Sequence, residues 1–484
     1  MPVKRIDKVT LIFPPYGERV PTPSTISAPM GLCSLAAFLL KNNFSVKVID
    51  ANVEGLNNEQ IVERLKQDPP QAIGISCLFT AFYNSTKALA ERLKQEFDAP
   101  IIVGGNQATA MSKLMIKDKN IDYIIEGEGE LPFVNLLQAL NNGKVDRKTI
   151  KGVAFREGEE VISTPRDGYI ENLDDLPLPP YHLFPMERYC EYNVSASRGC
   201  PFGCTFCASN VIFGRGLRMR SVDNVIAELE LLISRYGKKP LVFYDDFFTA
   251  NKKYVEELMD KMIAKNWGLQ WRCATRVNNI RPEVVAKLKA AGCVLMKYGV
   301  ESASPEILKT IKKGISRREI EQALAVTKEC GMPYSTFFMI GNRGENLETV
   351  KESFRLIKQL AIEEASFAIT VPLPGTELAE GLVREGILDY SVIDWDLLLP
   401  IHLIDRGYEK HAAEMAGKWC DLTPGEILEL AKIGALISRC NSFRAALKNK
   451  TSANNIYRHF LNMAKLFFEN PLVFIKAVNM YNNL

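Results

Sequence analysis

The stretch Ser197-Arg-Gly-Cys-Pro-Phe-Gly-Cys-Thr-Phe-Cys207 contains three cysteines at the spacing C-x-x-x-C-x-x-C, namely Cys200, Cys204 and Cys207. Thiolates are soft ligands that suit iron–sulfur clusters or zinc. A structural zinc site needs four ligands, and no fourth Cys or His lies nearby in the sequence. Three thiolates would leave one iron of a 4Fe–4S cluster open to a substrate. The motif therefore favours a catalytic cluster, with zinc or unligated loop thiols as the alternatives.

Six alternating strand and helix patterns follow one another from this stretch onward. Short apolar runs separated by helical patterns predict parallel strands. Six β–α units fit a partial (β/α)6 barrel better than a closed eightfold one, with the active site at the carboxyl ends of the strands. One helix has clear signals, with Ser304 as N-cap, Pro305 at its first position, Lys312-Lys313 in its last turn and Gly314 after it. The predicted strands are Val194–Ser197, Leu241–Tyr244, Leu269–Cys273, Val294–Val300, Tyr334–Met339 and Phe367–Val371.

The first 145 residues show the same alternation of short apolar runs and helical patterns. Such a pattern predicts an α/β fold with a doubly wound, Rossmann-like parallel sheet, which binds ligands at the carboxyl ends of its strands. The predicted strands are Val9–Phe13, Ser45–Ile49, Ala72–Ser76, Ile101–Val103 and Asp122–Ile125, and the predicted helices are Leu32–Leu40, Glu59–Lys66, Thr86–Gln95 and Leu131–Leu140.

Two breaks in this alternation divide the chain. Three prolines within Pro177–Pro180 cannot sustain a helix or a central strand, so a hairpin-like extension and a linker are expected there. From about residue 391 the alternation stops, and Leu422-Thr-Pro-Gly-Glu426 opens a helical region. The predicted parts are therefore residues 1–145, a linker over 146–188, the barrel over 189–390 and a C-terminal helical region over 391–484.

Composition narrows the class of protein. The chain has 484 residues, 47% of them hydrophobic, which predicts two to four folded domains and excludes a disordered protein. A net charge of +3 gives no signature of nucleic-acid binding. The chain contains no run of 18 apolar residues, so no membrane-spanning helix is expected. Residues Met1–Lys8 lack a signal-peptide pattern and the eleven cysteines are widely spread, so a cytoplasmic protein with reduced or metal-bound thiols is expected.

The cysteine motif after the first barrel strand resembles that of the radical SAM superfamily, in which S-adenosylmethionine (SAM) chelates the open iron of a 4Fe–4S cluster. The resemblance implies that Phe206 packs near the adenine and that acidic residues after the second strand meet the SAM amino group. Glu301 of the stretch Gly299-Val-Glu-Ser302 would accept the ribose hydroxyls, and Gly341 would form a turn near the adenine. Arg276 would meet the SAM carboxylate, with an ordinary surface arginine as the alternative. The implied SAM contacts are Phe206, Asp245, Asp246, Arg276, Glu301, Ser302 and Gly341.

The first domain resembles the cobalamin-binding domains of the methionine synthase type. The resemblance rests on Gly74-Ile-Ser-Cys-Leu78, Val103-Gly-Gly105 and Glu126-Gly-Glu-Gly-Glu130, and it implies cobalamin contacts at Ser76, Leu78, Gly104, Gly105 and Glu128. The axial-histidine motif of that type is absent, because the loop after the first strand reads Phe13-Pro-Pro-Tyr-Gly17 and no histidine precedes His182. Cobalamin is therefore expected base-off, without a protein histidine on cobalt. A nucleotide-binding Rossmann-like unit is the alternative.

Together the resemblances imply a cobalamin-dependent radical SAM enzyme. The expected activity is methyl transfer to an unactivated carbon through a 5′-deoxyadenosyl radical and methylcobalamin. Alternatives are a radical SAM oxidative cyclase or rearrangement enzyme with the same cofactors, or a non-enzymatic cobalamin or iron–sulfur sensor. Expected partners are a small-molecule or lipid-like substrate and an electron donor such as flavodoxin or ferredoxin. The apolar and basic segments 456–468 and 472–480 are expected either to pack on the protein or to contact a membrane surface.

Overall fold

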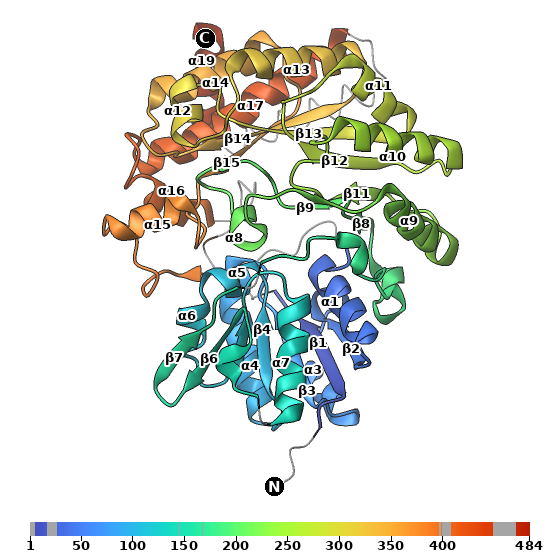
Figure 1. The fold of residues 1–484 in the computed structure, drawn as a ribbon. Helices are drawn as coiled ribbons and strands as arrows, with labels where there is room; N and C mark the ends of the chain where they lie inside the picture. The colour runs from blue at the N-terminus through green and yellow to red at the C-terminus, as the bar shows by residue number, and fades with distance from the viewer. Residues whose placement is uncertain are drawn as a thin grey trace. The chain divides into compact units, whose positions relative to one another are not determined.

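The computed structural model describes residues 5–16, 27–143, 145–166, 168–395, 398, 408–448 and 471–484 (Figure 1). The chain forms two compact units. The first contains residues 1–201, 207–244 and 373–396, and the second contains residues 202–206, 245–372 and 397–484. These units divide the chain differently from the predicted domain boundaries, which stay a prediction.

A seven-stranded sheet organises the start of the first unit, in the order β2-β1-β3-β4-β5-β6-β7. The first five strands are parallel, and β6 and β7 form an antiparallel hairpin that extends the sheet beside β5. The hairpin occupies part of the segment 146–188, so this part of the predicted extension belongs to the sheet. The strands are β1 (Lys8–Phe13), β2 (Ser45–Asp50), β3 (Ala72–Ser76), β4 (Ile101–Gly104), β5 (Tyr123–Ile125), β6 (Val153–Glu157) and β7 (Glu160–Ser163).

The central strands of this sheet form its core. Leu11 and Ile12 of β1, Ile73 of β3 and Ile101 of β4 are fully buried, as expected for parallel strands covered on both faces. Helix α1 packs against α7, and α3 packs against α4. Strand β2 lies on one side of β1, and β3, β4 and β5 follow on the other side. With right-handed crossovers, this change of side places the two helix pairs on opposite faces of the sheet. The helices are α1 (Met30–Lys41), α2 (Ala51–Glu54), α3 (Asn58–Gln67), α4 (Tyr83–Lys94), α5 (Asn106–Ala110), α6 (Ser112–Met115) and α7 (Glu130–Asn142).

The first unit also holds the start of the second strand series, and here the structure corrects a predicted strand. The expected strand Val194–Ser197 is split, because β8 ends at Val194 and Ser197 begins the separate strand β9. Strand β9 pairs antiparallel with β10, with Arg198 opposite Arg218. The cysteine motif therefore follows the short strand β9 instead of the strand β8. The elements are β8 (Tyr192–Val194), β9 (Ser197–Arg198), α8 (Ser209–Phe213), β10 (Arg218–Met219), α9 (Val222–Tyr236), β11 (Leu241–Phe243) and α15 (Glu377–Arg384).

The second unit contains four parallel strands that pair in chain order, β12 with β13, β13 with β14 and β14 with β15. Trp271 of β12, Tyr298 of β13 and Phe338 of β14 are among its largest fully buried side chains. The strands are β12 (Trp271–Thr275), β13 (Cys293–Glu301), β14 (Tyr334–Ile340) and β15 (Ala365–Ile369). Helix α10 (Lys252–Lys265) precedes β12, and the helices between the strands are α11 (Pro282–Ala290), α12 (Pro305–Thr310), α13 (Arg317–Glu329) and α14 (Leu347–Gln359).

The C-terminal helices belong to the second unit and confirm a helical region. Helix α17 begins at Pro424, where the Glu426 carboxylate accepts from the Thr423 N–H at 2.8 Å and Thr423 Oγ1 accepts from the Glu426 N–H at 3.3 Å. Helix α17 packs on β15 and α14, and α19 packs on α17. The helices are α16 (Tyr408–Ala416), α17 (Pro424–Lys448) and α19 (Pro471–Asn483).

The two predicted C-terminal apolar segments have different outcomes. Segment 472–480 lies within α19, whose Tyr481 hydroxyl accepts from Arg444 Nη1 at 2.5 Å, so this helix packs on the protein. Leu472 and Ile475 on the same helix are exposed. Segment 456–468 lies outside the described residues. Within the described ranges, no helix combines the length and hydrophobicity needed to cross a membrane.

Candidate cluster and cofactor sites

The three motif cysteines lie in a loop whose backbone is closely packed. Cys200 and Cys204 are buried, Cys207 is half-buried, and none forms a disulfide. Gly199 has φ 84°, and a Cβ there would lie 2.2 Å from the Gly216 carbonyl oxygen, so only glycine fits. In the second unit, the Thr205 N–H donates to the Ile311 carbonyl at 3.0 Å, which fixes the middle of the loop to the end of α12.

The donor set of this loop suits an iron–sulfur cluster better than a single ion. In the described part of the chain, no three His, Cys, Asp or Glu side chains are arranged to hold one metal ion. A 4Fe–4S cluster binds each thiolate through a different iron, so its ligands need not converge on one point. Three cysteines at this spacing fit such a cluster in number and chemistry, and the role of Cys200, Cys204 and Cys207 as its ligands stays a prediction.

Arg276 follows β12 and lies against the cluster loop within the second unit. It is buried, with its guanidinium 3.6 Å from the centre of the Phe202 ring and its Nη1 3.5 Å from Cys204 Sγ. Its Nη2 donates to the Lys313 carbonyl, and its Nε donates to Asn278 Oδ1 at 3.1 Å. The alternative of an ordinary surface arginine is therefore wrong. The structure gives this cation a place beside a cluster cysteine, and its contact with the SAM carboxylate stays a prediction.

Glu301 ends β13 in a left-handed conformation, with φ 68°. This region is costly for a residue other than glycine, and such strain is often kept at functional sites. Its Oε1 accepts from Lys313 Nζ at 2.9 Å, and both residues are buried. Ser302 is fully buried, and its Oγ accepts from the Ser304 N–H at 3.1 Å, so it shapes the turn before α12. The Glu301 carboxylate is therefore held by a lysine at a strand end, where a ribose contact is predicted.

Lys313 is a site residue that sequence reasoning placed wrongly. The expected helix continues through Lys312-Lys313, but α12 ends at Thr310 and Lys312 has φ 51°. The turn leaves Lys312 exposed and buries Lys313. The only sequence signal for this turn was Gly314, which has φ 65° and directly follows the lysine pair.

The other predicted SAM residues of the second unit differ in exposure. Asp245 is buried, Asp246 is exposed and Phe206 is half-buried. Gly341 follows β14 with φ 85°, which confirms a glycine turn at this position. The Trp419 indole Nε1 donates to the Gly341 carbonyl at 2.9 Å, so a C-terminal residue that the sequence did not single out supports this turn. The roles of these residues toward SAM stay predictions.

Glu345 is a second residue that sequence reasoning missed. Its Oε2 accepts from the backbone N–H groups of Gly341 at 2.7 Å and Asn342 at 3.0 Å, which fixes the glycine turn. Burial raises the pKa of the Glu345 carboxyl to about 7, and these hydrogen bonds oppose the increase.

The first sheet brings its two predicted cofactor loops together at the carboxyl ends of β3 and β4. The Cys77 N–H donates to the Gly104 carbonyl at 2.7 Å. Gly105 has φ 107°, and a Cβ there would lie 2.6 Å from the Cys77 carbonyl oxygen. Ser76 and Leu78 are half-buried on either side of Cys77, which is fully buried. Burial raises the pKa of that thiol to about 12, which makes it a poor ligand.

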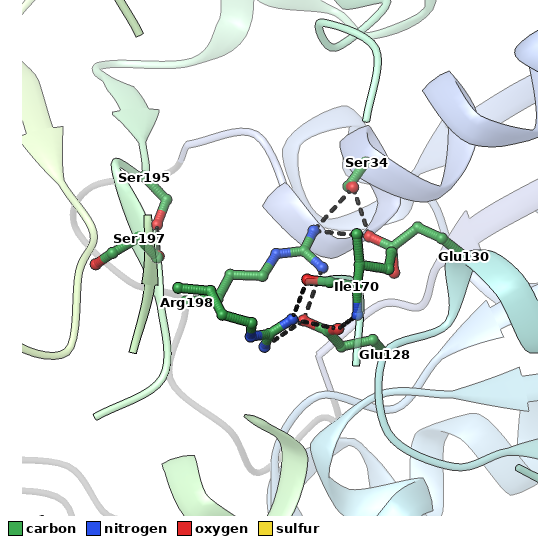
Figure 2. Close-up of polar contacts among 8 residues, drawn as sticks. Ser34, Glu128, Glu130, Ile170, Ser195, Ser197 and Arg198 are labelled. Carbon is green, nitrogen blue, oxygen red and sulfur yellow. Dashed lines mark hydrogen bonds and ion pairs between the residues drawn. The ribbon is translucent and has the colours of Figure 1, made fainter. Parts of the chain in front are cut away.

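Glu128 lies in a buried ion-pair cluster of the first unit, which Figure 2 shows. Its Oε1 accepts from Arg198 Nη1 at 3.0 Å, and its Oε2 accepts from Arg218 Nη1 at 2.8 Å and from the Ile170 N–H at 3.0 Å. Arg218 also lies 5.0 Å from the centre of the Tyr169 ring. The carboxylate is therefore satisfied by two arginines and a backbone amide, and its predicted contact with cobalamin stays a prediction.

Arg198 joins this cluster to the start of α7. Its Nη2 donates to Glu130 Oε1 at 2.7 Å and to Ser34 Oγ at 3.0 Å (Figure 2). Burial alone would raise the pKa of Glu130, but Arg198 and Ser34 hold it below its usual value. Arg198 lies two residues before Cys200, so these contacts anchor the chain that enters the cysteine motif.

Comparisons with known proteins agree with both resemblances. The model of the Radical SAM superfamily matches residues 194–357, and the model of the B12 binding domain matches residues 21–137. The chain is 33% identical over 405 residues to the uncharacterized methyltransferase PH0819 of Pyrococcus horikoshii, over 81% of this chain and 87% of that protein. It is 27% identical to the anaerobic magnesium-protoporphyrin IX monomethyl ester cyclase of Rubrivivax gelatinosus, over 78% of this chain and 71% of that protein.

A solved structure supports the fold. The radical SAM methyltransferase TsrM from Kitasatospora setae superposes with a TM-score of 0.69 at 18% identity, over 83% of this chain and 81% of that one. This likeness confirms the predicted α/β fold class, with an N-terminal parallel sheet, a radical SAM domain and a helical C-terminal region. The chain belongs to the cobalamin-dependent radical SAM enzymes. It is thus an enzyme with binding domains for a 4Fe–4S cluster, SAM and cobalamin.

Proposed function

We propose that this enzyme transfers a methyl group to an unactivated carbon of a small-molecule or lipid-like substrate. The observation that carries the proposal is the three-cysteine loop of a radical SAM domain in a chain that also has a cobalamin-binding domain. The relationship to PH0819, which is named a methyltransferase, favours this outcome. When bound, the cofactors would supply hydrogen abstraction and a methyl group, chemistry that side chains alone cannot provide.

The residues of this chain would bind and orient these groups. Cys200, Cys204 and Cys207 would hold three irons, while Arg276 places a fixed cation beside one of the thiolates. Glu301, held in place by Lys313, would accept hydrogen bonds from the ribose hydroxyls of SAM. Gly105 leaves the backbone at the end of β4 without a side chain, which suits the close approach of a cofactor tail.

We propose that cobalamin binds base-off, without a protein nitrogen on cobalt. No histidine precedes His182, and the half-buried Leu78 after β3 cannot ligate a metal. Electron paramagnetic resonance of the cobalt(II) protein tests this point. A spectrum without axial nitrogen splitting is expected, and a nitrogen splitting would contradict the proposal.

The test of the activity is anaerobic reconstitution with iron, sulfide, SAM and cobalamin, with a one-electron donor of the flavodoxin or ferredoxin class. SAM with a deuterated methyl group should give 5′-deoxyadenosine and a product from host extracts that carries the labelled methyl. Replacement of Cys204 by alanine should lower iron content and SAM cleavage at least tenfold. Normal cleavage in that variant would contradict the cluster assignment.

The relationship to the cyclase of Rubrivivax gelatinosus supports a second outcome, oxidative cyclisation with the same cofactors. The same experiment distinguishes the two, because cyclisation would yield 5′-deoxyadenosine and an oxidised product without the labelled methyl group. A protein that binds the cofactors but never cleaves SAM would instead be a sensor.

A further inference from the structure

Lys313 contacts two residues that are predicted to face the cofactors, through two different groups. Its ammonium donates to Glu301 Oε1 at 2.9 Å, and its carbonyl oxygen accepts from Arg276 Nη2. Glu301 ends β13, and Arg276 follows β12. One residue between α12 and α13 thus ties together the ends of two neighbouring strands.

The backbone around Lys313 is built to point this residue inward. Lys312 has φ 51° and Gly314 has φ 65°, so left-handed residues flank Lys313 on both sides. The Lys313 N–H returns to the Leu308 carbonyl at 2.9 Å, which closes the turn at the end of α12. A Cβ on Gly314 would lie 3.6 Å from the Phe202 ring of the cluster loop. The turn is therefore fitted against the same loop that carries Cys204.

Stability does not explain a buried lysine at this position. Burying an ion pair costs desolvation that its attraction often fails to repay, and hydrophobic replacements can be equally stable. An ammonium has three donors, and within the described residues the Lys313 ammonium has one partner, Glu301 Oε1. The second oxygen of Glu301 likewise has no partner in the described part of the chain. The pair is thus incompletely satisfied, which is typical of a site that receives a ligand.

We propose that Lys313 is a positioning residue for SAM, which holds the Glu301 carboxylate in place and oriented toward the ribose. The inference rests on the proposed binding of SAM at Glu301. Through its carbonyl, the same residue holds Arg276 beside Cys204, so one turn aligns the ribose contact with the cluster loop. Lys313 does not itself take part in the chemical step.

The test measures the SAM dissociation constant from the change that SAM causes in the spectrum of the reduced cluster. Lys313→Met should weaken SAM binding at least tenfold, while the iron content and the SAM-free spectrum stay those of the wild type. Lys312→Met is the matched control, because the neighbouring lysine is exposed, and its SAM affinity should be unchanged. Lys313→Arg keeps the charge and should recover part of the affinity.

A double variant keeps the test decisive if Lys313→Met leaves Glu301 unpaired and fails to fold. Lys313→Met with Glu301→Gln removes both buried charges. Because a positioning residue acts through its partner, this double variant should bind SAM as Glu301→Gln alone does. Additive losses, or wild-type affinity in a folded Lys313→Met variant, would overturn the inference. Absence of SAM binding in the wild type would instead refute the proposed function.

Discussion

Two buried ionic sites of this protein differ in how completely their carboxylates are satisfied. In the first unit, Glu128 accepts hydrogen bonds on both oxygens from Arg198, Arg218 and the Ile170 N–H. In the second unit, Glu301 has a single side-chain partner, Lys313, within the described residues. Glu301 also has a strained backbone, with φ 68°.

This difference distinguishes a cluster that supports the fold from an ion pair that can still bind a ligand. In the closed cluster both oxygens of Glu128 already accept hydrogen bonds, although Arg218 Nε is buried without a partner in the described residues. The network of Arg198 is therefore suited to fixing the chain that leads to Cys200. An open pair keeps an oxygen and donors available, and its strain is a cost that the surrounding structure must offset. Both sites are buried and charged, so burial and charge alone would not distinguish them.

The largest expected effect is a loss of stability when the closed cluster is broken. Arg198→Met leaves Glu130 buried without its cation, and the free energy of unfolding should fall by about 3–5 kcal/mol. Denaturant unfolding of the protein without its iron–sulfur cluster measures this loss of stability. Arg92→Met is the control in the same unit, since its partners Glu59 and Glu96 form exposed or half-buried pairs and the change should stay within about 1 kcal/mol. Equal losses in both variants would contradict a special role for the Arg198 network.

Glu345 extends the comparison to a buried carboxylate that is held by backbone N–H groups instead of a cation. Its pKa is raised to about 7, so the folded state resists its ionisation and loses stability as the pH rises through that value. Glu345→Gln removes this titration while its carbonyl can still accept both N–H groups. Between about pH 5 and pH 8, the stability of the variant relative to wild type should rise by about 2–3 kcal/mol. If the stabilities of the two proteins changed with pH in parallel, this would contradict a raised pKa of the Glu345 carboxyl.

Glu130 should show the opposite pH dependence with a smaller effect. Its pKa is lowered by Arg198, so its contribution to stability is present above the usual value of 4.5 and is lost as the pH falls through the lowered one. Acid unfolding of the wild type should therefore be steeper than that of Glu130→Gln. A variant with the same acid profile as the wild type would show that this carboxylate is not held by its ion pair.

The sequence predicted the elements that depend on local pattern. The five parallel strands of the first sheet and its longer helices α1, α3, α4 and α7 were found within a few residues, because short apolar runs and helical periodicity decide them. The short helices α2, α5 and α6 were not predicted. The cysteine motif was visible from its spacing, and the glycine turn at Gly341 from the resemblance to the radical SAM superfamily. The start of the C-terminal helical region within Leu422–Glu426 was also predicted, and α17 begins at Pro424.

The sequence could not predict features that depend on tertiary contacts. Nothing local distinguishes Lys313 from Lys312, and only the folded turn buries one and exposes the other. Arg276 could not be told from a surface arginine until the Phe202 ring and Cys204 were placed beside it. Glu128 was matched to a cofactor role by resemblance, whereas its ion pairs come from arginines about 70 and 90 residues away.

The distinction between an open and a closed ionic site is tested most directly by SAM titration of two conservative variants. Glu301→Gln and Glu128→Gln each replace a buried carboxylate by a neutral amide in the reconstituted enzyme. The spectrum of the reduced cluster reports the dissociation constant of SAM in each. We predict about a tenfold weaker affinity for Glu301→Gln, equivalent to about 1.4 kcal/mol, and wild-type affinity for folded Glu128→Gln. Unchanged affinity in Glu301→Gln, or a loss confined to Glu128→Gln, would contradict this account.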